Sequence, residues 1–117
     1  MRPTVLIVDD HEAFRDAARS LLESEGFDVV GEAVAGHDAI AEVVRLCPDV
    51  VLLDIQLPDL DGFAVADRLA AVGTAPDVVL ISSREADTYG ARLKDAPARG
   101  FLAKRDLSGA ALARLLA

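Results

Sequence analysis

Residues 50–54 (VVLLD) decide the fold, because this apolar run ends abruptly on the carboxylate of Asp54. A second run of the same kind, residues 5–10 (VLIVDD), ends on the pair Asp9 and Asp10. Short runs that are apolar at every position are typical of strands buried on both faces of a parallel sheet. All strands of such a sheet end at one edge, where open α/β folds bind ligands. Three carboxylates that meet there would raise one another's pKa values unless a cation joined them, so the two runs predict a divalent-metal pocket.

Around these two runs, strand-like and helix-period segments alternate along the whole chain. The predicted strands are residues 4–9, 28–34, 49–54, 77–82 and 100–104, and helical period follows each of them, over residues 14–22, 37–46, 65–72, 85–95 and 108–116. Gly26 ends the first helix, and Ser108 is the expected N-cap of the last. Right-handed crossovers and a polar second strand favour the strand order 2-1-3-4-5, with that strand at an edge. The expected fold is therefore a flavodoxin-like, three-layer α-β-α sandwich around a five-stranded parallel sheet.

The composition sets limits on the class of protein. The 117 residues, 52% hydrophobic and 27% charged, suit one globular domain that spans residues 1–117. The net charge of −8 argues against a nucleic-acid-binding surface, which needs clustered lysines and arginines. No apolar run approaches the roughly 18 residues of a membrane span, and the N-terminus lacks the pattern of a signal peptide. These features predict a cytoplasmic protein that acts away from membranes.

The single cysteine, Cys47, excludes a disulfide within the chain and agrees with a reducing compartment. The apolar stripe of the second predicted helix consists of Ile40, Val43, Val44 and Cys47. Spacings of three and four residues place these side chains on one side of a helix. We therefore expect Cys47 to complete the stripe and to lie in the core.

Four of the five strand ends carry charged or hydroxyl side chains, and these are Asp9 with Asp10, Asp54, Ser82 and Lys104. The carboxylates of Asp10 and Asp54, with a loop carbonyl, would hold Mg²⁺ loosely. Lys104 offers a point charge to a carboxylate or to a phosphoryl oxygen, and Ser82 can donate a hydrogen bond to the same group. Asp54 lies between metal and lysine and is the candidate nucleophile toward phosphorus, a role that aspartate has in known phosphoryl transfers.

At four places the sequence resembles the receiver domain of two-component response regulators. Residues 7–11 (IVDDH) are similar to that family's first strand and acidic pair, residues 51–62 (VLLDIQLPDLDG) to its phosphoacceptor strand and loop, residues 80–83 (LISS) to its fourth-strand hydroxyl site, and residues 100–104 (GFLAK) to its fifth-strand aromatic and lysine. Arg105 follows Lys104 where many receivers have proline, which is familiar in receivers of the LuxR/NarL type. The resemblance covers the whole chain.

The resemblance implies a role for each matching residue of the acidic pocket. Asp54 would be the phosphoacceptor, and it would bind Mg²⁺ directly together with Asp10 and the backbone carbonyl of Gln56. Asp9 would act on the metal mainly through a bound water molecule. A sensor histidine kinase would supply the phosphoryl group, and the phosphorylated chain would switch conformation to control an output partner.

The same resemblance implies how the phosphorylated state would be read. Ser82 and Lys104 would hold the phosphoryl group after transfer, and Phe101 would be an aromatic switch that turns inward when Ser82 moves. Phe101 replaces the tyrosine that is frequent in the family, so it has no hydroxyl with which to report the state. Four further polar residues near the pocket are interpreted as solvated or loop residues rather than metal ligands: His11, His37, Asp59 and Asp61.

Two other functions remain open from the sequence. A haloacid-dehalogenase-type phosphatase would need a second aspartate two residues after the nucleophile, where this chain has Gln56. A receiver-like interaction module that works without phosphorylation usually lacks an acidic residue or the lysine, and both are present here. We therefore expect a signalling module rather than an enzyme, with phosphotransfer to itself and slow autodephosphorylation as its only reactions.

The output of the chain is the largest gap in the sequence-based interpretation. No helix-turn-helix follows the last predicted helix, so we do not expect this chain to bind DNA itself. A stand-alone receiver is favoured over a piece of a longer transcription regulator. The sequence leaves open the cognate kinase, the output partner, the phosphorylation lifetime and dimerisation on phosphorylation.

Overall fold

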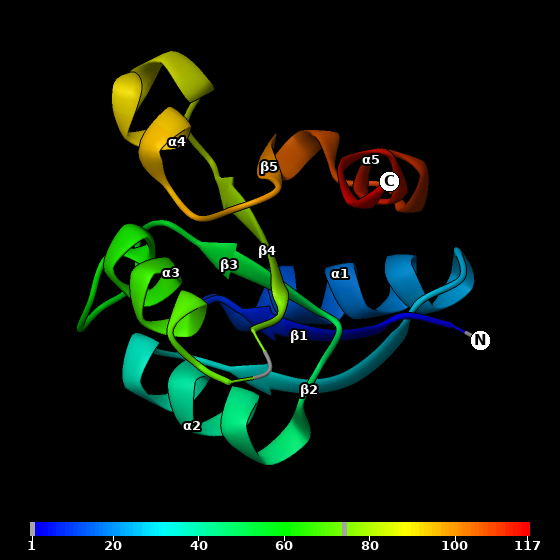
Figure 1. Cartoon of the computed structure of the whole chain (residues 1–117). Helices are drawn as coiled ribbons and strands as arrows, with labels where there is room; N and C mark the ends of the chain where they lie inside the picture. The colour runs from blue at the N-terminus through cyan, green and yellow to red at the C-terminus, as the bar shows by residue number, and fades with distance from the viewer. Residues whose placement is uncertain (1, 74) are drawn as a thin grey trace.

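Five parallel strands form one sheet in the order β2-β1-β3-β4-β5 (Figure 1). They are β1 (Thr4–Val8), β2 (Asp28–Ala33), β3 (Val50–Asp54), β4 (Asp77–Ser82) and β5 (Gly100–Ala103). The computed structural model describes residues 2–73 and 75–117 of the chain. The strand order and the fold class agree with the expectation from the sequence, and the polar strand β2 lies at an edge.

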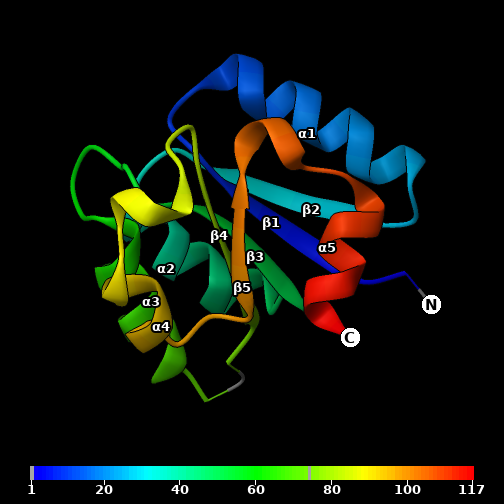
Figure 2. The ribbon, with the colours of Figure 1, turned by 90° about the horizontal axis from the view of Figure 1, so that it is seen from above.

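Helices cover both faces of the sheet and make the expected three layers. They are α1 (Glu12–Ser24), α2 (Gly36–Leu46), α3 (Gly62–Ala70), α4 (Ala91–Asp95) and α5 (Gly109–Leu116), with short 3₁₀ turns η1 (Ala86–Thr88) and η2 (Lys104–Asp106). Figure 2 shows α1 and α5 on one side of the sheet, and α2, α3 and α4 on the other. Within the described residues, no helix combines the length and the apolar character that a membrane crossing requires.

The central strands are apolar at every position between their ends, and both of their faces are covered. Along β1, Val5 and Ile7 pack into the core beneath α1 and α5, whereas Leu6 and Val8 pack into the core beneath α2 and α3. All four side chains are fully buried. Burial of one such side chain contributes about 1.5–3 kcal/mol to folding, so these runs anchor the sheet on both sides.

The strand register brings the polar strand ends together. Val8 of β1 pairs with Leu53 of β3, so Asp9 and Asp54 follow on adjacent strands. Asp54 in turn pairs with Ile81 of β4, one residue before Ser82. Parallel pairing therefore places both carboxylates and the hydroxyl at the carboxyl edge of the sheet, where the strand order changes direction.

The local helix signals agree with the structure. Gly26 has a φ of +105°, a left-handed conformation that favours glycine, and it lies directly after the end of α1. The Ser108 side chain accepts a hydrogen bond from the backbone N–H of Ala111, as an N-cap does. These two residues set where α1 ends and where α5 begins.

The prediction that Cys47 lies in the core is wrong. The helix α2 ends at Leu46, and Cys47 is its C-cap, with a left-handed φ of 47°. This conformation turns the side chain away from the helical stripe, and Cys47 is exposed. Val44 is also 62% exposed, so the buried face of α2 is narrower than its apolar spacing predicts and consists mainly of Ala39 and Val43.

The predicted helix over residues 85–95 is broken in the structure. It forms the 3₁₀ turn η1 and the five-residue helix α4, and Gly90 with a φ of +55° lies between them. The weak apolar face of this stretch explains the break, because short helices depend on packing for their stability. None of residues 86–95, all of which the structure describes, is fully buried.

Candidate functional site

Two carboxylates and one lysine form the centre of the site. Asp9 follows β1 and is completely buried, Asp54 ends β3 and is 2% exposed, and Lys104 follows β5. The Nζ atom of Lys104 lies 2.6 Å from Oδ2 of Asp9 and 3.3 Å from Oδ2 of Asp54. The structure thus brings together three residues that the sequence distributes over almost the whole chain.

The charges of this centre depend on burial and on the ion pairs. Burial raises the pKa of Asp54, although the N–H of Gln56, which donates to Oδ1 at 3.0 Å, and the charge of Lys104 both favour the ionised form. Burial alone would lower the pKa of Lys104, but its ion pairs with Asp9 and Asp54 outweigh burial and raise it. Lys104 therefore stays protonated, because its ion pairs favour the charged form. For Asp54, burial disfavours the charged form of the carboxylate.

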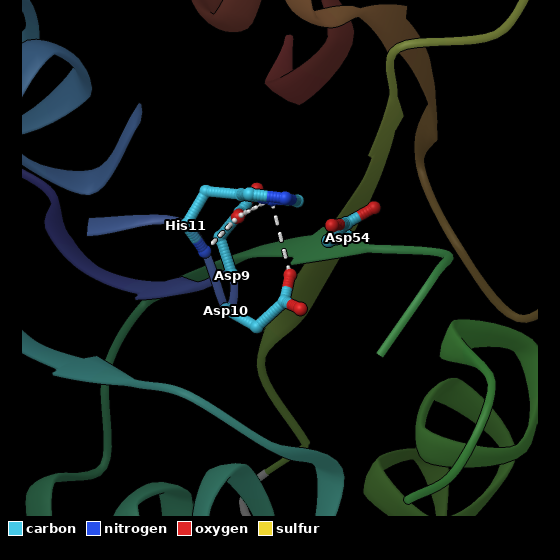
Figure 3. A group of neighbouring side chains, drawn as sticks. All are labelled: Asp9, Asp10, His11 and Asp54. Atoms are coloured by element: carbon cyan, nitrogen blue, oxygen red, sulfur yellow. Dashed lines mark hydrogen bonds and ion pairs between the residues drawn. The ribbon is translucent and has the colours of Figure 1, made fainter. Parts of the chain in front are cut away.

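Two further side chains complete an acidic group that could hold a metal ion. Asp10 and His11 start the turn from β1 into α1, and Figure 3 shows them beside Asp9 and Asp54. One ligand atom from each of the four residues lies within 4.8 Å of the others. The Nδ1 atom of His11 lies 3.2 Å from Oδ1 of Asp9 and 3.1 Å from Oδ1 of Asp10. His11 is the N-cap residue of α1 and its side chain is 70% exposed, which agrees with its interpretation as a solvated residue beside the pocket.

Two side chains of α1, which sequence reasoning did not identify as part of the site, contact Lys104 and Asp9. The Nζ atom of Lys104 lies 4.7 Å from the ring centroid of Phe14, a cation–π distance. Arg15 donates to the backbone carbonyl of Asp9 at 2.8 Å and pairs with Glu32 of β2. The position of Arg15 beside the apolar stripe of the helix was the signal that could have identified it, since a largely buried guanidinium needs acceptors.

The loop between β3 and α3 is fixed by its own carboxylates. Asp59 accepts hydrogen bonds from the N–H groups of Gly36 and His37 at the start of α2, and these hold its pKa well below the usual range. Asp61 accepts from the N–H of Ala64 and caps α3. Both aspartates therefore act as caps of neighbouring helices.

The hydroxyl site lies at the end of β4. Ser82 is completely buried, and its Oγ atom lies 2.7 Å from the hydroxyl of Tyr89 and accepts a hydrogen bond from the N–H of Arg84 at 3.0 Å. Phe101 of β5 is half-buried, and its ring centroid lies 6.1 Å from that of Tyr89. Sequence reasoning identified Ser82 and Phe101 but missed Tyr89, which joins them.

The fold and the site define a class of protein: an open, parallel α/β domain whose switch-point edge carries buried carboxylates, a hydroxyl and a lysine. A model of the response regulator receiver domain family matches residues 5–114. The chain therefore belongs to this family, which functions in two-component signal transduction, as the sequence motifs predicted.

Known proteins with similar sequences and structures support this assignment. The virulence factors transcription regulator BvgA of Bordetella pertussis is 37% identical over 102 residues, which cover 87% of this chain and 49% of that protein. A protein-glutamate methylesterase/protein-glutamine glutaminase of Anaeromyxobacter dehalogenans is 43% identical over 112 residues, which cover 94% of this chain and 31% of that protein. The signal receiver domain of NarL from Mycobacterium tuberculosis superposes with a TM-score of 0.85 at 31% identity, over 98% of this chain and 97% of that chain. The chain spans about half the length of the first curated relatives.

Proposed function

We propose that the chain accepts a phosphoryl group on Asp54 from a phosphohistidine of a sensor histidine kinase and changes conformation in response. The observation that carries this proposal is the setting of Asp54. Its carboxylate is buried, its pKa is raised by that burial, and the ammonium of Lys104 lies 3.3 Å away. This setting joins a nucleophilic oxygen to a fixed cation that can offset the charge of a phosphoryl group.

The proposed transfer moves one phosphoryl group between two side chains. A carboxylate oxygen of Asp54 attacks phosphorus and forms a new P–O bond. The bond between phosphorus and the imidazole nitrogen of the donor breaks, and its electron pair stays on that nitrogen. Lys104 would then pair with a phosphoryl oxygen, and Ser82, which follows the residue paired with Asp54, would donate a hydrogen bond to the same group. Because the donor is a second protein, the chain is a signalling module rather than an enzyme with a substrate of its own.

The carboxylates of the pocket form a donor set that fits Mg²⁺. Asp9, Asp10 and Asp54 offer hard oxygen atoms within 4.8 Å of one another, and Mg²⁺ prefers such ligands together with retained water. Asp10, Asp54 and the backbone carbonyl of Gln56 would hold the ion directly, and Asp9, which the Lys104 ion pair already engages, would act through water. When bound, the ion would offset negative charge on the transferring phosphoryl oxygens.

Labelling with a small phosphodonor tests the proposal without knowledge of the cognate kinase. The chain is incubated with acetyl phosphate and Mg²⁺, and the intact mass is measured. We expect one phosphoryl group on the native chain, none on Asp54→Ala, and none when EDTA replaces Mg²⁺. Asp67→Ala is the matched control, because Asp67 is an exposed aspartate of α3.

Two outcomes would contradict the proposal. Unchanged labelling of the Asp54→Ala variant would show that another residue is the acceptor. A native chain that takes up no phosphoryl group from either acetyl phosphate or a panel of autophosphorylated kinases would favour an interaction module that works without phosphorylation.

A further inference from the structure

The hydrogen bonds of Ser82 are made to residues outside the acidic pocket. Its Oγ atom lies 2.7 Å from the Tyr89 hydroxyl and accepts from the N–H of Arg84. A serine hydroxyl has one proton and two acceptor positions, so these two contacts use most of its capacity. Ser82 is completely buried, which makes the loss of either contact costly unless another polar group replaces it.

The Tyr89 hydroxyl is held in place by aromatic packing. The Tyr89 ring makes an edge contact with Phe63 of α3, at a centroid distance of 5.8 Å, and a tilted contact with Phe101 of β5, at 6.1 Å. Both distances fall in the range of favourable aromatic pairs. Tyr89 therefore stands between two elements of the fold, and its hydroxyl reaches a third, the end of β4.

Tyr89 also belongs to a weakly packed segment of the chain. It lies between η1 and α4, and the next residue, Gly90, has a φ of +55°. None of residues 86–95, each of which the structure describes, is fully buried. A segment with few buried contacts changes position at low cost, so a single hydrogen bond can bias where it lies.

We propose that Tyr89 is a positioning residue whose hydroxyl holds Ser82 in the resting state and is released when Ser82 turns toward a phosphoryl group. The inference rests on the proposed phosphorylation of Asp54 and extends it. It assigns to Tyr89 the hydroxyl contact that Phe101 has no atom to make, and it makes the segment of residues 86–95 the part of the molecule that responds.

The physical basis is that one hydroxyl occupies one staggered position at a time. Asp54 pairs with Ile81, so a phosphoryl group on Asp54 would lie next to the strand end that carries Ser82. A charged phosphoryl oxygen is a stronger acceptor than a phenol, and it would draw the whole Ser82 hydroxyl into a different staggered position, toward the pocket. Tyr89 would then lose its partner, and its ring and the attached segment would be free to move between Phe63 and Phe101.

The chain itself offers a site-specific probe, because Tyr89 is its single tyrosine and it has no tryptophan. Incorporation of 3-fluorotyrosine gives one ¹⁹F NMR signal from the ring of Tyr89. We expect beryllofluoride with Mg²⁺, which mimics an acyl phosphate, to shift this signal in the native chain. We expect Ser82→Ala to show a shifted signal without beryllofluoride, whereas the matched control Ser83→Ala, at an exposed neighbouring serine, keeps the resting signal.

The variant Tyr89→Phe tests the energetic side of the inference, because it removes the hydroxyl and keeps the ring. Without the competing contact, Ser82 should turn toward the pocket more readily. We expect half-saturation at a beryllofluoride concentration about threefold to tenfold lower than in the native chain, the effect of one hydrogen bond. Binding is followed through the ¹⁹F signal of bound beryllofluoride, which does not depend on the tyrosine.

The outcomes separate this inference from the proposed function. If beryllofluoride binds the native chain but leaves the Tyr89 signal unchanged, or if Tyr89→Phe binds it no more tightly, the inference is wrong and the phosphorylation of Asp54 stands. If beryllofluoride does not bind the native chain at all, the proposed function falls and the inference falls with it.

Discussion

The acidic pocket and the segment of residues 86–95 are linked through Ser82, which ends β4 and contacts Tyr89, but they are built in opposite ways. In the pocket, Asp9 and Asp54 are buried and both contact Lys104. The segment consists of one 3₁₀ turn and a five-residue helix, with no fully buried residue within that described stretch. Figure 1 shows it beyond α3, on the side where β5 forms the edge of the sheet. The difference indicates a division of roles. The strands hold the reactive side chains in fixed positions, and the weakly packed segment of residues 86–95 can change position in response.

The largest expected effect is a difference in stability between leucine substitutions in the sheet and in the segment of residues 86–95. Leu53 is fully buried in β3, whereas Leu93 of α4 is only partly buried. We expect Leu53→Ala to lower the free energy of unfolding by about 2–5 kcal/mol and Leu93→Ala by about 1 kcal/mol. Urea denaturation of both variants provides the measurement. Equal losses would mean that the segment is packed as firmly as the sheet, and the comparison would fail.

The second prediction concerns Gly62, which packs directly against the backbone at the end of β3. A Cβ atom on Gly62 would lie 2.6 Å from the backbone oxygen of Asp54 and 2.6 Å from the Cα atom of Ile55. Both are backbone atoms, so relieving this overlap requires the backbone to shift. We expect Gly62→Ala to cost about 1–3 kcal/mol and to weaken Mg²⁺ binding, because it displaces the end of β3. Gly73→Ala is the matched control, since no atom of the described residues beyond its immediate chain neighbours lies within 4 Å of its Cβ position. A Gly62→Ala variant as stable as Gly73→Ala would disprove the proposed rigidity of this loop.

The third prediction concerns the cost of burying the charged carboxylate of Asp54. Burial raises the pKa of this carboxyl above its unfolded value of about 3.9, so folding disfavours the charged form. The resulting loss of stability is absent below the unfolded pKa and complete above the folded pKa. Asp54→Asn should therefore raise the melting temperature by a few degrees at pH 7 in EDTA. The exposed control Asp67→Asn should leave it unchanged, and a lower melting temperature for Asp54→Asn would contradict this account of the pocket.

The smallest effect is expected at Asp59, which ties the pocket loop to α2. Hydrogen bonds from His37 and Gly36 lower the pKa of Asp59, so its contribution to stability is present above the unfolded pKa of about 3.9 and is lost as the pH falls. Asp59→Asn keeps an acceptor but removes the charge. We expect this variant to be slightly less stable than the native chain at pH 7, with a difference that begins to shrink as the pH falls below about 5 and goes on shrinking toward the lowered pKa of the folded state. A difference that is constant with pH would exclude the charge as its cause.

Most of the fold follows from the sequence because the strands are buried on both faces. Their apolar runs need no periodicity to be recognised, and the strand over residues 77–82 was predicted with its observed bounds. The errors fall where a single backbone conformation decides the outcome. Cys47 leaves the helical stripe through a left-handed φ, and Gly90 interrupts the predicted fourth helix with another positive φ. Apolar spacing carries no information about either turn.

The candidate site could be predicted in part for a similar reason. Parallel strands carry their last residues to one edge, so the meeting of Asp9, Asp54 and Lys104 follows from topology alone. The contact between Ser82 and Tyr89 does not follow from topology, because it crosses an irregular segment without period. The sequence holds one indication of this contact: Tyr89 is a large aromatic residue in a stretch otherwise too polar to form a packed helix.

Hydrogen–deuterium exchange tests the central claim most directly, namely that chemistry in a rigid pocket moves the segment of residues 86–95. Exchange is measured by peptide with Mg²⁺, in the presence and absence of beryllofluoride, for the native chain and for Asp54→Ala. The account predicts a change in the peptides that cover residues 86–95, little change in α2, and no change in Asp54→Ala. A native chain that binds beryllofluoride and changes in α2 but not in residues 86–95 would contradict it.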